Sequence, residues 1–241
     1  MSTYQNLPSA SGSYAPTQNR AIVAERTFVN TVYLWMTAGL MVTAFTALLV
    51  ASSPGLVNPV LENTFLRFGL LIAQLGAVIF LSARIEKMSV ATARLTFLAY
   101  AVLTGFTLSI LFVVYTQGSL FNAFAVSGGM FGVMSLYGYT TKADLSRLGS
   151  ILGMGLIGLV IATVVNLFWA NSTLYWITTY AGVLIFVGLT AYDTQKIKRM
   201  GESSATDGER GQKYAVLGAL TLYLDFINLF LLMLRLLGNR K

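Results

Sequence analysis

Long apolar runs alternate with short polar segments over nearly the whole chain. Seven apolar runs of around 20 residues follow one another, at roughly 30–51, 65–84, 95–115, 120–139, 149–170, 174–194 and 213–235. A helix of about 20 apolar residues can cross the hydrocarbon core of a bilayer. Because a soluble core does not need runs of this length, the pattern predicts an all-α membrane protein with seven transmembrane helices.

The turns between the runs are too short to separate domains. We therefore expect one seven-helix transmembrane domain at 27–241, preceded by a disordered cytosolic tail at 1–26 that starts small and polar with two prolines. Gly128 and Gly132 form a GxxxG pattern in the fourth run. This pattern predicts close helix packing at that point.

The amino-acid composition limits the kinds of catalytic and metal-binding site that the chain can form. The chain is 56% hydrophobic and 10% charged, whereas an ordinary soluble domain is about a quarter charged. The absence of cysteine and histidine excludes disulfides, thiol and Ser-His-Asp catalysis, and Cys- or His-ligated metals. We expect no enzyme activity and no cofactor, and any pH sensing would have to come from carboxylates.

Basic residues gather on one side of the expected topology. With the N-terminus in the cytosol, the cytosolic segments hold twelve of the 16 Lys and Arg residues: Arg20, Arg26, Arg84, Lys87, Arg94, Lys142, Arg147, Lys196, Lys198, Arg199, Arg210 and Lys213. Only Arg67 lies outside before the last run, while Arg235, Arg240 and Lys241 follow it. The positive-inside rule therefore predicts a cytosolic N-terminus, and the net charge of +7 indicates contact with anionic lipid rather than nucleic acid.

The last apolar run has one charged residue in its interior, Asp225. It lies at least 10 residues from either end of that run, and a carboxylate at such depth costs at least roughly 2.5–3.5 kcal/mol. Asn228 follows on the same helical face, and Tyr223 lies nearby on a different face. A structural hydrogen bond to a neighbouring helix is one explanation, but acids inside spans usually mark ion or proton paths, so we favour a functional carboxylate.

Asp193 is the second acid, near the end of the preceding run. A salt bridge with Lys196 or Lys198 at the membrane surface would explain it alone, but consecutive spans are antiparallel neighbours, so we expect it to meet Asp225. Two close carboxylates can share one proton, and carboxylate oxygens suit calcium. We predict that the pair senses pH and binds the ion, with Arg84 as a latch or counter-ion unless it only anchors its span.

Four stretches of this sequence resemble one known family. They are Gly188–Lys198 (GLTAYDTQKIK), Gly218–Arg235 (GALTLYLDFINLFLLMLR), Ser135–Ser146 (SLYGYTTKADLS) and Ala73–Ile85 (AQLGAVIFLSARI). They resemble the Bax inhibitor motif (TMBIM) membrane family, in particular its bacterial inner-membrane branch of the YbhL and YccA type. The resemblance extends from about residue 27 to the end.

The resemblance implies six helices around a central last helix, in a multi-pass protein of the bacterial inner membrane. It also implies a pH-sensitive calcium leak gated by an aspartate pair at Asp193 and Asp225, with the latch arginine at Arg84. Calcium would be the transported or bound ion, and protons, lipid and calcium the partners.

Other functions stay open from the residues. A non-transporting regulator of membrane proteases or stress proteins is the main alternative, with residues 1–19 and 195–213 as contact surfaces. A proton-coupled cation exchanger could use the same acids. An intramembrane aspartyl protease also needs two membrane aspartates, but the Gly-x-Gly-Asp pattern of such enzymes is missing, because Leu222-Tyr223-Leu224 precede Asp225.

Overall fold

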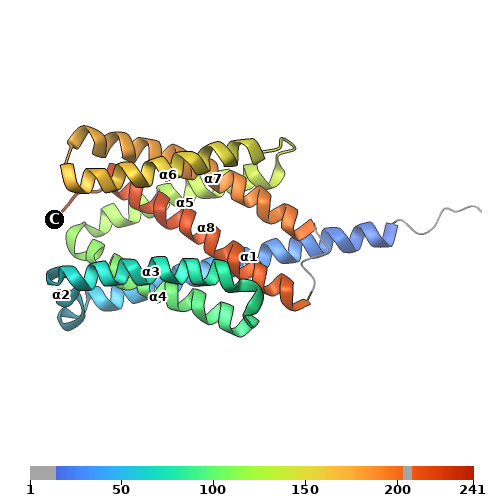
Figure 1. The fold of residues 1–241 in the computed structure, drawn as a ribbon, viewed down its shortest axis with the longest axis horizontal. Coiled ribbons are helices and arrows are strands. Elements are labelled where there is room, and N and C mark those ends of the chain that lie inside the picture. The colour runs from blue at the N-terminus through green and yellow to red at the C-terminus, as the bar shows by residue number, and fades with distance from the viewer. Residues whose placement is uncertain (1–14, 203–207) are drawn as a thin grey trace, which may run out of the picture.

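The computed structural model describes residues 15–202 and 208–241, with side chains from residue 22, and these parts of the chain form α-helices and no strands (Figure 1). The helices are α1 (Ala15–Ala51), α2 (Pro54–Glu62), α3 (Thr64–Arg84), α4 (Val90–Val114), α5 (Gln117–Thr140), α6 (Ser146–Trp169), α7 (Ser172–Glu202) and α8 (Gly208–Leu237), with a 3-10 turn, η1 (Ile85–Lys87).

Seven of these helices are long and apolar enough to cross a membrane, which confirms the predicted all-α membrane fold. The exception is α2, a nine-residue helix that the sequence analysis did not anticipate. It begins with Pro54 at its first position, where a missing N–H costs nothing, and buries Val57 and Val60. It therefore serves as a connector between α1 and α3.

Successive long helices run in opposite directions, so the connections gather at two ends of the bundle (Figure 1). We call the end that holds residues 85–89 and 141–145 the N-side. The end that holds residues 52–63, 115–116 and 170–171 is the C-side. Polar side chains cap helix starts at both ends, because Asn63, Ser89 and Thr116 each accept a hydrogen bond from an N–H of the helix that follows.

The last helix is the most buried of the seven spans. In its most apolar window 67% of the residues are buried, compared with 0% for α6. α8 packs against α1, α5 and α7 and to a smaller extent against α4 and α3, and it crosses the bundle obliquely in Figure 1. α6 packs on α7 and faces α8 across a cavity, so a closed ring of six helices around α8 stays a prediction.

The first helix begins earlier than the sequence predicted. A tail is expected at 1–26, but α1 is helical from Ala15, and of this expected tail residues 1–14 lie outside the described part of the chain. Glu25 and Phe28 are buried on this extension. They pack on Gly201 near the end of α7, where a Cβ would press on the Glu25 backbone. This contact gives the extension a packing partner, which a free tail lacks.

Close packing of α5 occurs at Gly138 and not at the GxxxG pattern. A Cβ at Gly138 would collide with the backbone of Ala191 in α7. By contrast, Gly128 and Gly132 have nothing within 4 Å of the position of a Cβ. The close packing predicted for the GxxxG pattern is therefore wrong within this bundle, because no described residue approaches either glycine closely.

We expect Gly138→Ala to push α5 away from α7 and to lower the free energy of unfolding by about 1–3 kcal/mol, the usual cost of overpacking. Thermal unfolding in detergent would measure this as a lower Tm. Gly132→Ala is the matched control, on the same helix but with open space, and it should be neutral or slightly stabilising. Equal Tm values for the two variants would contradict the assignment.

Candidate functional site

The structure brings the two membrane aspartates together at the contact between α7 and α8. Asp193 is 8% exposed and Asp225 is 5% exposed. Their carboxyl groups lie within hydrogen-bonding reach of each other. Neither carboxylate forms an ion pair with another described residue. The predicted pairing of Asp193 and Asp225 is therefore present in the fold.

Both aspartates line a cavity of about 670 Å³ between α6, α7 and α8. Its walls are mostly aliphatic, and polar groups come from Thr163, Thr178, Tyr192, Thr221, Asn228 and Arg235. The lining runs from Gly149, close to the N-side, to Arg235, close to the C-side. The cavity thus places the pair in a space that extends along much of the bundle.

One oxygen of the pair is fully buried and has no hydrogen-bond donor among the described residues. Asp225 Oδ2 is buried and accepts no hydrogen bond from any described residue. An unsatisfied buried acceptor costs about 1–3 kcal/mol, and more when it is charged. A proton, a water molecule or a cation in the cavity would remove this cost, so the geometry favours the binding of small polar species at Asp225.

Asn228 and Tyr223, the two polar residues expected to support the aspartates, lie on opposite sides of α8. Asn228 lines the cavity next to Asp225, and its Nδ2 donates to the carbonyl of Leu224 at 2.8 Å. Its side-chain oxygen accepts no hydrogen bond from the described residues, so it can face the cavity as a ligand.

Tyr223 does not belong to the site, which corrects the prediction. Its ring packs edge-on against Phe97 and Tyr100 of α4, and its hydroxyl lies 2.6 Å from Thr43 Oγ1 of α1. Two residues correspond to roughly 200° around a helix, so Tyr223 and Asp225 must face opposite ways. Tyr223 therefore anchors α8 to α1 and α4.

Arg84 is likewise not brought to the aspartates in this structure. It is the last residue of α3, it is exposed, and it lines none of the cavity that holds the pair. The cation whose charge acts on Asp193 is Lys196, one turn further along α7. The expected latch contact is thus absent from this arrangement, because α3 packs on α4, away from α6 and α7.

α7 is longer than the sequence predicted, so Asp193 lies further from the end of its helix than expected. The sequence suggested that Asp193 lies near the end of its helix, but α7 continues to Glu202. Asp193 therefore lies about 14 Å inside the helix end, at a rise of about 1.5 Å per residue. The extension is stable as a helix because Gln195, Ile197 and Gly201 are buried on it.

A clamp that the sequence analysis missed holds this part of α7 to the loop at 141–145. Gln195, 6% exposed, accepts from the N–H of Leu145 at 2.9 Å and donates to the carbonyl of Ala143 at 2.7 Å. Arg199 donates to Asp144 at 2.7 Å. The sequence signal for this clamp is Gln195, a polar residue two positions after Asp193, together with the polar segment at 141–145 that it contacts.

The acid of the clamp, Asp144, lies in a loop outside the spans and stays charged at ordinary pH. Hydrogen bonds from Ser146 and then from Arg199 lower the pKa of Asp144 to about 2. A lowered pKa means that this contact is complete above the ordinary pKa of an aspartate, near 4, and is lost only as the pH falls toward 2. The clamp therefore does not respond to pH near neutrality.

Tyr192 lies between the aspartate cavity and the N-side. It lines the aspartate cavity and also a second cavity of about 260 Å³, which it shares with Lys196 and Arg199. Its ring packs on Gly149, where a Cβ would collide with it. The ring thus lies between the aspartate cavity and the smaller cavity on the N-side.

The acidic groups suit transient binding of a cation better than a resident metal site. Among the described residues, no three acidic side chains come together as metal ligands would. Calcium takes six to eight oxygen ligands, so the two carboxylates and Asn228 would need several waters to complete the shell.

We expect Gln195→Leu to free the loop at 141–145, because it leaves the buried N–H of Leu145 without an acceptor at a cost of about 1–3 kcal/mol. Hydrogen exchange should become faster at residues 143–146 and at the end of α7. Gln117→Leu, an exposed glutamine on the C-side, is the control and should leave exchange unchanged. Unchanged exchange in Gln195→Leu would show that the clamp contributes nothing.

Known proteins resemble this chain over almost its full length. A family model described as inhibitor of apoptosis-promoting Bax1 matches residues 25–241. The inner membrane protein YbhL of Escherichia coli strain K12 is 53% identical over 217 residues, which is 90% of this chain and 93% of that protein.

Two more distant bacterial relatives align over a similar extent. An uncharacterized protein of Deinococcus radiodurans is 43% identical over 227 residues, 94% of this chain and 96% of its own length. An uncharacterized protein of Borreliella burgdorferi is 41% identical over 224 residues, 93% and 97% of the two chains. With the family model, the seven spans and these relatives together, the chain belongs to the Bax inhibitor family of multi-pass membrane proteins.

Proposed function

We propose that this protein is a pH-sensitive cation leak channel of the bacterial inner membrane, with calcium as the transported ion and Asp193 and Asp225 as the gate. The observation that carries the proposal is the buried contact between the two carboxyl groups inside a long cavity. The inner-membrane location is carried over from the printed name of the relative YbhL.

Protonation would control both the shape and the charge of the site. With a shared proton, the carboxyl groups hydrogen-bond and hold α7 against α8. When both are ionised, they repel each other and attract a hard cation. Loss of the shared proton would both loosen the contact between α7 and α8 and attract cations, so calcium flux should rise as the pH rises.

Access would come from the N-side, which we propose to be cytosolic because it carries most of the basic residues of the spans and loops. An ion would pass Tyr192, reach the pair and Asn228, and continue between α6 and α8 toward the C-side. The cavity lined by these residues extends in both directions from the pair.

We expect Asp193→Asn and Asp225→Asn each to abolish the pH dependence of calcium flux into proteoliposomes. An asparagine keeps the shape of the side chain but can neither ionise nor share the proton. Flux measured with a trapped calcium indicator from pH 5.5 to 8.5 would show a flat profile for both variants and a rising one for the wild type.

Two control variants test whether removing an acid outside the pair has the same effect on flux. Glu62→Gln removes an exposed acid on the C-side and should leave the flux and its pH profile unchanged. Asp144→Asn removes the acid of the clamp, whose pKa of about 2 keeps it ionised throughout the measured range, and should also keep the rising profile. An unaltered profile in both site variants would exclude the pair as the pH sensor.

The same vesicles distinguish the channel from the alternatives. Absence of flux in the wild type at every pH would favour a regulator of membrane proteases or stress proteins. Flux that requires a pH difference across the membrane, rather than a given pH on both sides, would favour proton-coupled exchange. Cleavage of a model transmembrane substrate that both aspartate variants lose would favour a protease.

A further inference from the structure

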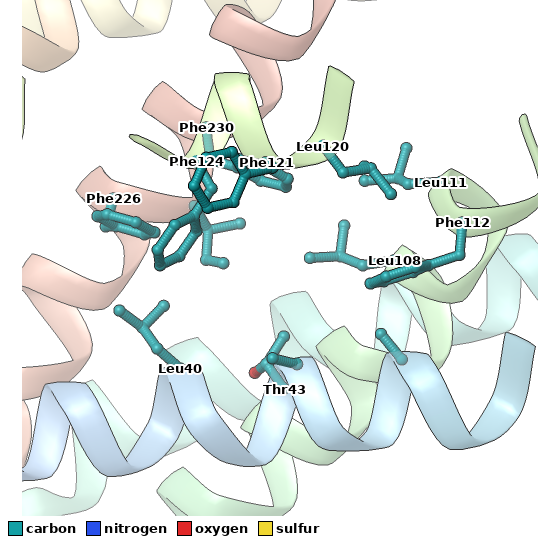
Figure 2. A pocket seen from close by; sticks show the side chains of 13 residues that line it. Leu40, Thr43, Leu108, Leu111, Phe112, Leu120, Phe121, Phe124, Phe226 and Phe230 are labelled. Atoms are coloured by element: carbon teal, nitrogen blue, oxygen red, sulfur yellow. The ribbon is translucent and has the colours of Figure 1, made fainter. Parts of the chain in front are cut away.

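A third cavity, separate from the two near the aspartates, lies between α1, α4, α5 and α8 near the C-side (Figure 2). It has a volume of about 210 Å³. Figure 2 shows the rings of Phe121, Phe124 and Phe230 on one side of it and Leu40 and Thr43 on the other. Thr43 brings little polarity, because its hydroxyl is bonded to Ala101 and Tyr223. The cavity therefore suits an apolar ligand.

The cavity opens sideways, toward the surroundings of the bundle. α5 packs on α7 and α8 but scarcely on α4, although the two helices are consecutive. Phe121 and Phe124 are 71% and 52% exposed, while Leu108, Leu120 and Phe226 behind them are buried. The lining residues belong to spans that cross the hydrocarbon core, so the opening faces lipid chains and not water.

Positive charge is fixed beside this opening by the end of the chain. Residues 239–241 pair with the turn between α4 and α5, through hydrogen bonds of Thr116 N to Asn239 O and of Lys241 N to Val114 O. Lys241 Nζ donates to the carbonyl of Phe112 at 2.8 Å, and the side chain of Phe112 lines the cavity. Arg240 and Lys241 are exposed and form no ion pair with a described acid.

We propose that this cavity holds an acyl chain of an anionic phospholipid, whose headgroup is bound by Arg240 and Lys241. The two features fit one molecule, because the lining residues from α4 and α5 lie in the last turns of α4 and the first turns of α5, next to the turn on which residues 239–241 pack. An apolar cavity inside a membrane protein stays dry and is filled by the hydrocarbon that can enter it. Two adjacent cations favour a negatively charged headgroup over a zwitterionic one.

The experiment uses the full chain in phosphatidylethanolamine vesicles with a small fraction of phosphatidylglycerol that carries a diazirine on one acyl chain. After illumination, mass spectrometry locates the attached lipid. We expect attachment to concentrate at Leu108–Phe112 and Leu120–Phe124 above that on the exposed surface of α6. We expect the same diazirine on phosphatidylcholine to lose most of this preference.

Two variants test the cavity and the headgroup separately. Ala44→Phe places a ring in the cavity, since Ala44 lines it, and attachment there should be lost. Ala73→Phe adds the same ring on the exposed face of α3 and should change nothing. Arg240→Gln with Lys241→Gln should keep attachment but abolish the preference for phosphatidylglycerol.

Attachment spread evenly over all lipid-facing helices, or unaffected by Ala44→Phe, would overturn the cavity as a lipid site. Equal attachment of the two lipids to the wild type would overturn the role of Arg240 and Lys241. None of these readouts depends on calcium flux, so they stand apart from the proposed channel function.

Discussion

The burial of two carboxyl groups against each other is the constraint on which this structure depends. An ionised acid in a membrane span is expensive, and two of them in contact would be more so, unless a proton or a cation is bound. The fold meets this demand by placing Asp193 and Asp225 at the same level of two adjacent helices and by opening a cavity beside them. In the function we propose, the contact between α7 and α8 would therefore depend on whether a proton or a cation is bound there.

The surroundings of the pair are rigid on one side and open on the other. α7 is held by the backbone approach at Gly138, by Gln195 and by the contact of Gly201 with α1. Tyr223 fixes the far side of α8 to α1 and α4. On the open side, α6 stands away from α8. In the proposed gate, a change of charge at the pair would therefore need to move only a few of the helices.

The bundle has two gaps with different chemistry. The gap between α6 and α8 holds acids, an amide and hydroxyls, and it extends toward both ends. The gap between α4 and α5 is almost wholly apolar and ends beneath two cations. The polar lining of the first fits the ion we propose, and the apolar lining of the second fits the proposed lipid chain, so α8 separates two cavities of different chemistry.

The sequence by itself determined the class of fold, the seven spans and the pairing of Asp193 with Asp225. Run length and the cost of a charge in hydrocarbon are local properties, and antiparallel order follows from short turns. The tertiary structure alone decided which sides of the helices meet. It turned Tyr223 away from the site, left Arg84 exposed and moved close packing from Gly128 and Gly132 to Gly138. A helix that is apolar all around does not show in its sequence which face has a partner, because lipid and protein interiors select the same residues.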